Sequence, residues 1–97
     1  MRIIAKRTLT EFWSRYPDAQ EPLQAWYREA VASKWTSPQS IKSRYRTASF
    51  VGSDRVVFNI RGNNYRLVVK VIYDYSLVYI RFLGTHSEYD RINATEI

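Results

Sequence analysis

The side chains best suited to chemistry lie in the C-terminal half of the chain. His86 is the only histidine among the 97 residues, and histidine is the side chain that most readily gains or loses a proton near neutral pH. It follows an apolar run typical of a strand, and the ends of strands commonly carry functional residues. His86 is therefore our candidate for a general acid or base. The alternative is a surface histidine or one with a structural hydrogen bond.

Two arginines, Arg66 and Arg81, interrupt segments that are otherwise apolar and β-branched. An arginine in such a segment gives up a packing position and must be either paired or exposed. Its planar guanidinium can contact a phosphate at two points, which lysine cannot do. We interpret both as candidate phosphate ligands. The alternative is a salt bridge to Glu88, Asp90 or Asp54.

Tyr89 and Asp90 follow His86 closely in the chain. The phenol of Tyr89 could transfer a proton, or its ring could stack on a base. With eight tyrosines in the chain, a place in the core or at its rim is the alternative. Asp90 could orient His86 or Arg81, but we favour a role in capping the last helix.

Other kinds of site have little support in the sequence. It contains no glycine-rich phosphate loop and no nucleophile elbow. One histidine and no cysteine leave no recognisable zinc site. We therefore expect no metal and no cofactor.

Length and charge narrow the class of protein. Ninety-seven residues suffice for one domain, so we expect residues 1–97 to form a single unit. Fifteen Lys and Arg against nine Asp and Glu give a net charge of +6. This excess favours a polyanionic partner such as RNA, DNA, an anionic membrane surface or an acidic protein. A basic surface kept for solubility is the alternative.

The absence of cysteine excludes disulfide bonds and is compatible with a reducing compartment. The N-terminal apolar run is too short for a signal peptide, and no stretch has the length of a transmembrane helix. We expect a soluble, cytoplasmic protein without a membrane partner.

The N-terminal half predicts a short extended segment and two helices. Residues 2–6 are extended, and Thr8 with Glu11 forms a possible capping box for a helix over about 9–16. Pro17 ends that helix. A second helix is predicted by helical spacing, and Asp18 or Pro22 marks its start. Its apolar face comprises Leu23, Trp26, Tyr27, Ala30 and Val31, continued by Lys34.

The segment from Thr36 to Ser53 has no clear periodicity. It contains Pro38, serines at positions 37, 40, 43 and 49, and three cations, which is typical of a long surface connection. A single turn of helix near residues 39–42 is compatible with the pattern.

The remainder predicts three antiparallel strands at 55–60, 65–73 and 77–83. Residues 61–64 have the composition of a turn. Even positions 56, 58 and 60 share one face of the first strand, odd positions 67, 69 and 71 one face of the second, and even positions 78, 80 and 82 one face of the third. A final helical turn is expected within 87–93. The order β-α-α-β-β-β predicts an α+β fold, with two helices on one face of a mainly antiparallel sheet and a partly cationic free face opposite.

Four short motifs in the C-terminal part carry a family resemblance. They are Val57-Phe58-Asn59, Gly62-Asn63-Asn64-Tyr65-Arg66, Tyr79-Ile80-Arg81 and Thr85-His86-Ser87-Glu88-Tyr89-Asp90. With these motifs the chain resembles the HigB toxins of type II toxin–antitoxin modules, within the wider RelE-like superfamily of mRNA interferases. The N-terminal half matches that family in layout only.

The resemblance implies an endoribonuclease that cuts mRNA in the decoding site of the ribosome. It also implies a helix-turn-helix antitoxin of the HigA type, through which the complex would bind operator DNA. Cleavage of RNA without a metal proceeds by attack of the ribose 2′-hydroxyl on the adjacent phosphate, which calls for a base, an acid and cations. His86, Arg66, Arg81 and Tyr89 are the residues to which we assign this chemistry.

Further cations could contact the RNA backbone. For each of them a solvated face of the protein is the alternative. They are Lys70, Arg61, Lys42, Arg44 and Arg46.

Two other functions compete with the toxin hypothesis. A non-catalytic RNA- or ribosome-binding module could use the same basic face of the sheet. A toxin-like domain could instead only bind a helical antitoxin. Cleavage of mRNA separates the first alternative from an enzyme, and intact growth on expression without the partner would indicate the second.

Overall fold

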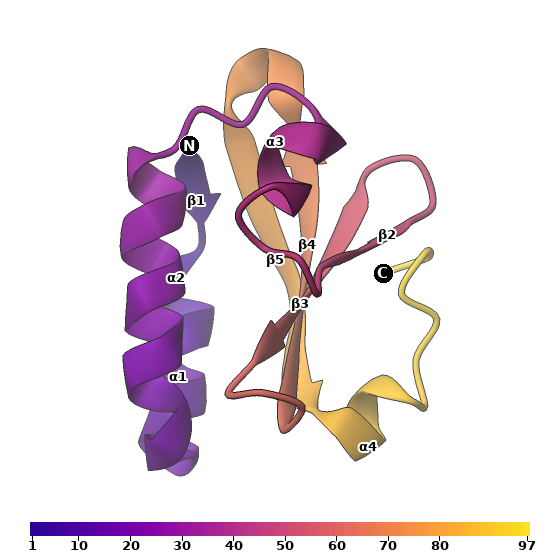
Figure 1. The fold of residues 1–97 in the computed structure, drawn as a ribbon. Coiled ribbons are helices and arrows are strands. Elements are labelled where there is room, and N and C mark those ends of the chain that lie inside the picture. Colours follow the sequence, from indigo (N-terminus) through magenta and orange to yellow (C-terminus); the bar gives the residue numbers. More distant parts are fainter.

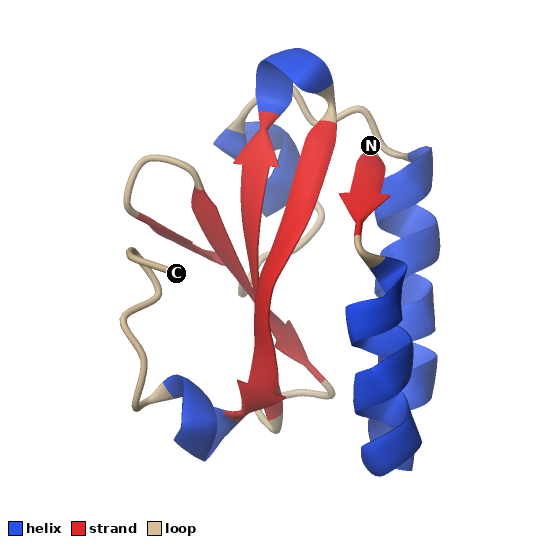
Figure 2. Ribbon diagram, turned by 180° about the vertical axis from the view of Figure 1, so that it is seen from behind, coloured by secondary structure: helices blue, strands red, loops and turns tan.

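Two helices cover one face of a five-stranded sheet in the computed structural model, which describes residues 1–97. Figures 1 and 2 show α1 and α2 on one side of the sheet, and α4 with the C-terminal segment on the other. The predicted α+β class is therefore confirmed. The elements are β1 (Arg2–Ile4), α1 (Lys6–Arg15), α2 (Gln20–Ala32), α3 (Pro38–Lys42), β2 (Ser49–Val51), β3 (Arg55–Ile60), β4 (Tyr65–Ile72), β5 (Leu77–Thr85) and α4 (His86–Tyr89). None of the helices has the length and apolar character needed to cross a membrane.

The strands lie in the order β1-β5-β4-β3-β2. β1 runs parallel to β5, and every other pair is antiparallel. β2 is the one strand that the sequence does not predict, because its three residues fall in the segment that we expected to be irregular. Pairing with Arg55–Val57 of β3 defines it. The helical turn expected near 39–42 is present as α3.

The first helix begins earlier than predicted. α1 starts at Lys6 after an extended Ala5, and Thr8 lies inside it without a capping hydrogen bond. The capping box predicted from Thr8 and Glu11 is therefore wrong. The backbone N–H of Thr8 bonds instead to the carbonyl of Ala5, so the first turn forms without a side-chain cap.

The second helix presents most of its predicted face to the core. Leu23, Trp26 and Ala30 of α2 are buried, whereas Val31 is 46% exposed. Placing Val31 on the buried face is therefore wrong. Pro22 lies in the first turn of α2, which directly follows the 3-10 turn Pro17–Ala19 in the chain.

The main core lies between these helices and one face of the sheet. The predicted alternation holds in β3 and β4, because their alternate apolar residues share one cluster with the buried residues of α1 and α2. Aromatic contacts tie the layers together: the Trp26 and Phe58 ring centroids lie 5.5 Å apart, and those of Phe12 and Tyr65 lie 5.3 Å apart. Trp26 and Trp35 are buried, as expected for core residues.

A β-bulge at Arg81 changes the alternation along β5. Ile80 is opposite Val69 and Phe82 is opposite Val68, so β5 carries one extra residue between these pairs. An inserted residue moves every following side chain to the other face of the sheet. The uninterrupted alternation predicted for this strand is therefore wrong beyond Ile80.

The bulge places Phe82 on the face opposite the helices. Its ring centroid lies 6.4 Å from that of Tyr89, and Leu83 packs against the main core instead. We predicted Phe82 on the same face as Val78, so this assignment is corrected.

The second face of the sheet is partly covered by the C-terminal segment. Val57, Val68 and Ala94 form a small buried cluster there, and Arg55 Nε donates to the backbone oxygen of Ile97 at 2.6 Å. The sequence predicts this face as free. The structure leaves only part of it open, because the chain beyond α4 folds back over the far half (Figure 1).

Candidate active site

The candidate site lies at one corner of the sheet, where β4 begins, β5 ends and α4 starts. Arg66 of β4 pairs with Gly84 of β5. Two residues after Gly84, the backbone N–H of His86 donates to the carbonyl of Asn64 at 3.0 Å. The register of β4 and β5 therefore brings Arg66 and His86 to the same corner, although twenty positions separate them in the chain.

The hairpin turn between β3 and β4 is fixed to the helical layer. Arg61 and Gly62 take positive φ angles of 52° and 62°. The hydroxyl of Tyr65 donates to the carboxylate of Asp18, and Arg61 Nε lies 3.4 Å from the same carboxylate. The hydrogen bond to Asp18 raises the pKa of Tyr65, and burial adds to that rise. Asp18 thus anchors this turn rather than capping α2.

A capping box orients the first turn of α4. The N–H of Glu88 donates to Thr85 Oγ1 at 3.2 Å, and the N–H of Thr85 donates to Glu88 Oε1 at 2.8 Å. This reciprocal pair satisfies two N–H groups at the helix start. His86 and Tyr89 are three residues apart in that turn and so lie on one side of it. The final helical turn was predicted within 87–93, and it forms at 86–89.

His86 is half-exposed, and its ring is oriented by a carboxylate. Nδ1 of His86 lies 3.1 Å from Oδ2 of Asp90. With the proton on Nδ1, that nitrogen donates to Asp90 and leaves Nε2 without a protein partner. Asp90 thus contacts His86 and not Arg81. Asp90 is also the C-cap of α4, as we predict, although through its backbone: its N–H donates to the carbonyl of His86 at 3.0 Å.

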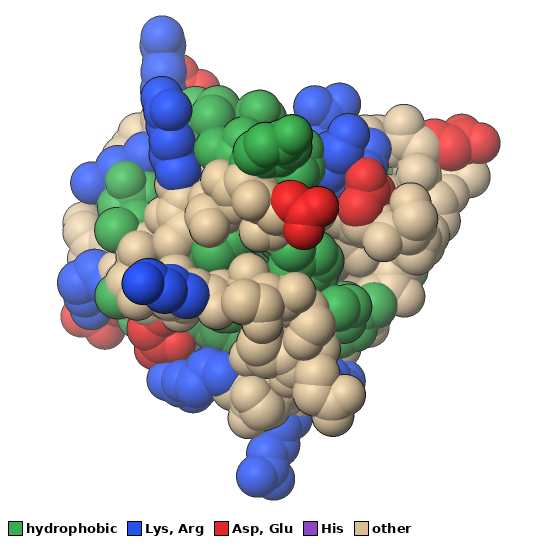
Figure 3. Space-filling view, turned by 90° about the horizontal axis from the view of Figure 1, so that it is seen from above, with side chains coloured by type: hydrophobic (Ala, Val, Ile, Leu, Met, Phe, Trp, Pro, Cys, Tyr) green, Lys and Arg blue, Asp and Glu red, His purple; other side chains and the backbone are tan.

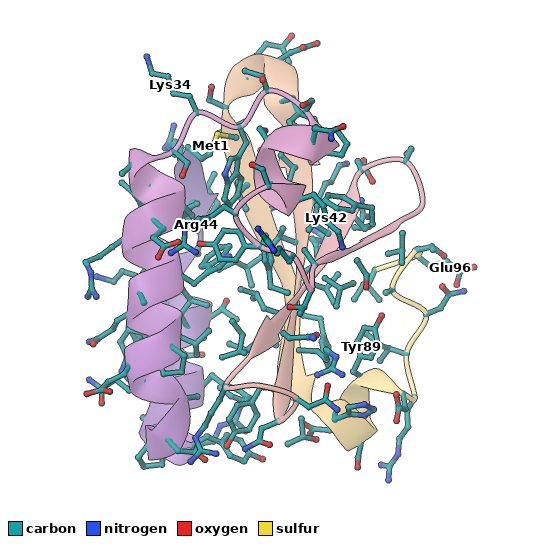
Figure 4. All side chains as sticks on the ribbon, viewed as in Figure 1. Met1, Lys34, Lys42, Arg44, Tyr89 and Glu96 are labelled. Carbon is teal, nitrogen blue, oxygen red and sulfur yellow. The ribbon has the colours of Figure 1, made fainter.

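Arg66 is the only buried charged residue, with 9% of its surface exposed. Nη1 donates to the carbonyl of Asn63 at 3.1 Å, and Nη2 donates to Oδ1 of Asn63 at 2.7 Å. Its guanidinium carbon lies 6.0 Å from the centroid of the Tyr89 ring. Figure 4 shows Tyr89 between the sheet and the C-terminal segment.

No carboxylate pairs with Arg66. Glu88 caps Thr85, Asp90 contacts His86, and Asp54 pairs with Arg55 at 2.5 Å. Taking a charge out of water costs on the order of several kcal/mol in real proteins unless it is paired. No acidic side chain of the protein therefore offsets the charge of this buried guanidinium, which makes Arg66 our candidate for binding an anion.

Arg81 does not join this group of contacts. It lies at the bulge, is exposed, and makes no hydrogen bond or ion pair. The salt-bridge alternative thus fails for Arg81 as it does for Arg66. Bulges often redirect a side chain beside a functional site, but Arg81 stands farther along the sheet than the Arg66–Gly84 pair.

The five cations predicted for RNA contact are dispersed. Arg61 pairs with Asp18, Arg44 lies 2.7 Å from Glu29, and Lys42 Nζ donates to the carbonyl of Ala48 at 2.8 Å. Figure 4 shows Lys42 and Arg44 well away from Tyr89. From above, Lys and Arg side chains are spread around the rim of the molecule rather than gathered in one patch (Figure 3).

Lys70 and Arg46 are the remaining two of these cations. Lys70 stands on the same face of β4 as Arg66, 3.8 Å from Asp54. Arg46 is exposed and makes no ion pair. Arg46 is therefore the best candidate among the five for contact with a nucleic acid backbone.

The candidate site is an open surface. The cavities of the molecule measure between about 220 and 470 Å³ and lie along the helices and at the hairpin turn. None is lined by His86, Arg66, Arg81 or Tyr89. Small-molecule sites are usually concave pockets, so an open corner with an anion position suits a polymer better than an enclosed metabolite.

Sequence reasoning missed three residues that build this corner. Asn63 holds Arg66, the carbonyl of Asn64 holds the start of α4, and Gly84 leaves room for its neighbours. We took both asparagines simply as turn residues. The spacing of Asn63 three positions before an arginine inside a strand is a signal that could have suggested the contact.

Gly84→Ala should destabilise the protein by about 1–3 kcal/mol through overpacking. A Cβ at this position would lie 2.6 Å from Cζ of Phe82 and 2.9 Å from Oε1 of Glu88. The Glu88 carboxylate would then leave the Thr85 N–H, and α4 would lose its cap. Thermal denaturation measures the change, with Ser87→Ala, at an exposed position in the same helix, as the matched control. An unchanged melting temperature would show that the corner tolerates the methyl group.

Comparison with known proteins places the chain in a family. Residues 19–92 match the HigB toxin family, described as the RelE-like toxic component of a toxin–antitoxin system. The chain is 30% identical over 96 residues to the mRNA interferase toxin HigB of Escherichia coli strain K12, covering 97% of this chain and 92% of that protein. The mRNA interferase HigB proteins of Escherichia coli O157:H7 and Shigella flexneri match with the same identity and coverage. Since both the family match and the relatives extend over most of the chain, this protein belongs to the HigB family of RelE-like toxins.

Proposed function

We propose that this protein is an endoribonuclease that cleaves mRNA and thereby stops translation and growth. The observation that carries the proposal is that Arg66 and His86 lie at the same open corner of the sheet. The guanidinium of Arg66 is buried without a counter-ion, and Nε2 of His86 has no protein partner. The relatives that it resembles over nearly its whole length are named mRNA interferases, which agrees with this chemistry.

The reaction that fits these groups needs no metal. The ribose 2′-oxygen attacks the adjacent phosphorus, its proton passes to a base, and the bond from phosphorus to the 5′-oxygen breaks as an acid protonates that oxygen. The products are a 2′,3′-cyclic phosphate and a 5′-hydroxyl. Nε2 of His86 performs one of the two proton transfers, and Tyr89, on the same side of α4, is a further group that could assist. Arg66 holds the phosphate oxygens as their negative charge grows.

The remaining cations serve affinity in this proposal. Arg81 and Arg46 contact the backbone of mRNA or ribosomal RNA, since each side chain is exposed and no group of the protein pairs with it. Such contacts add salt-dependent affinity without reading the sequence. The other four cations contribute less to affinity, because groups of the protein already hold them: Arg61, Lys42, Arg44 and Lys70.

The partners follow from the family. A toxin of a toxin–antitoxin system has an antitoxin. We infer that this antitoxin is a helix-turn-helix protein of the HigA type, through which the complex binds operator DNA. We infer further that residues 1–97 act as one domain on mRNA in the decoding site of the ribosome, and hence in the cytoplasm.

Primer extension on mRNA in translating ribosomes tests the proposal. The wild-type protein should produce new 5′ ends, and free mRNA without ribosomes should be cut far less. Ribosome binding without any new 5′ ends would favour the non-catalytic RNA-binding alternative. Normal growth and intact mRNA on expression without the antitoxin would point instead to a domain that only binds its partner.

A further inference from the structure

The contacts of Arg66 occupy one edge of its guanidinium and leave the other unused. Asn63 accepts from Nη1 through its backbone carbonyl and from Nη2 through Oδ1, at 3.1 and 2.7 Å. Nη1 also lies 3.4 Å from the carbonyl of Tyr65. A guanidinium has five N–H groups, and neither the Nε–H nor the second Nη2–H has a protein partner. These two N–H groups point the same way and can bind two oxygens of one phosphate.

Every acceptor around Arg66 is neutral, whereas the partly buried Arg55 of the same sheet pairs with a carboxylate. The side chain of Arg55 is 12% exposed, and its Nη1 lies 2.5 Å from Oδ1 of Asp54. Arg66, the one buried charged residue, is held instead by an amide oxygen and by backbone carbonyls. A carboxylate at that distance would offset the positive charge that a bound phosphate needs.

We propose that Asn63 is a positioning residue, which orients the Arg66 guanidinium through neutral acceptors and so keeps its full charge available to the scissile phosphate. This inference rests on the proposed function, because it deepens the role of Arg66 in RNA cleavage. Asn63 lies in the hairpin turn between β3 and β4. This turn is itself anchored to the helical layer, because Arg61 pairs with Asp18.

Asn63→Asp separates positioning by a neutral group from a purely structural role. Aspartate keeps the acceptor and adds charge-assisted hydrogen bonds to Arg66, so the melting temperature should stay equal or rise. The single-turnover cleavage rate at saturating ribosomes should nevertheless fall by about tenfold or more, since the phosphate then competes with a carboxylate. Asn63→Ala should lower both the rate and the stability.

A matched control adds the same charge elsewhere. Gln20→Glu, at an exposed position at the start of α2, should leave the cleavage rate close to that of the wild type. Equal cleavage by the wild type and Asn63→Asp would overturn the inference. So would a parallel loss of stability and rate in Asn63→Asp, because that pattern indicates a structural role only.

Titration with inorganic phosphate distinguishes failure of the inference from failure of the proposed function. Chemical shifts of the Arg66 Nε–H should move on addition of phosphate to the wild type, and should move much less in Asn63→Asp. If the wild type cleaves no RNA but responds to phosphate more strongly than Asn63→Asp does, the proposed function fails, while the orientation of Arg66 by neutral acceptors stands. If the wild type cleaves RNA and the two proteins respond equally to phosphate, the inference fails and the function stands.

Discussion

Replacing Arg66 by alanine is expected to lower the single-turnover rate of mRNA cleavage by roughly 30- to 1000-fold, which corresponds to about 2–4 kcal/mol of transition-state stabilisation. The reason is that Arg66 is a buried cation without a carboxylate partner, so the phosphate would be the anion that it binds most strongly. Stability should change much less, because the variant loses hydrogen bonds to neutral groups but also removes a buried charge.

Further variants of Arg66 show whether the cleavage rate depends on the two-point geometry of the guanidinium or only on its positive charge. Arg66→Lys retains a positive charge but loses the two-point geometry, so it should recover little of the rate. Arg15→Ala removes an exposed arginine at the end of α1 and is the matched control, with a rate close to that of the wild type. Arg81→Ala should act on affinity, because its side chain is exposed and stands apart from the Arg66 contacts. A loss of affinity alone in Arg66→Ala, at an intact single-turnover rate, would make Arg66 a positioning residue for the RNA instead.

His86→Gln should reduce cleavage by about 10²–10⁴-fold, which is the usual contribution of general acid–base catalysis. Glutamine can still donate a hydrogen bond to Asp90, so α4 and the fold should be retained, but it cannot transfer a proton. Single-turnover kinetics measure the effect, with the wild type and the variant compared on the same ribosome-bound mRNA. Antitoxin binding and the melting temperature should remain unchanged.

The partners of His86 make the result specific. Asp90→Asn should cause a smaller loss than His86→Gln, because the amide leaves the proton transfer in place while weakening the contact that orients the ring at 3.1 Å. Unchanged cleavage in His86→Gln would move the proton transfer elsewhere, and Tyr89→Phe would then be the next variant to measure.

Local patterns in the sequence predicted much of the fold. The buried face of α2 and the alternating faces of β3 and β4 follow from side-chain periods of 3.6 and 2, which depend only on neighbouring residues. Helix boundaries were less well predicted, because α1 starts from an extended Ala5 and not from a side-chain cap. β2 could not be found from sequence, since three residues form a strand only through pairing with β3.

The bulge at Arg81 shows a second limit of local patterns. Apolar residues occupy both faces of β5. An extra residue in this strand therefore does not visibly change its hydrophobic pattern. Which face Phe82 takes depends on its pairing with Val68 of β4. The same pairing decides that the aromatic ring beside Tyr89 comes from β5.

Residue types alone single out four side chains as candidates for the chemistry, on a domain with a net charge of +6: His86, Arg66, Arg81 and Tyr89. Tertiary contacts fix which of them lie at the same corner of the sheet. Hydrogen-bond register between β4 and β5 places Arg66 opposite Gly84, next to the turn that carries His86 and Tyr89, while the bulge leaves Arg81 outside. Register and burial arise from contacts between distant segments. For that reason only the folded chain could show that Arg66 has an asparagine, and no carboxylate, as its partner.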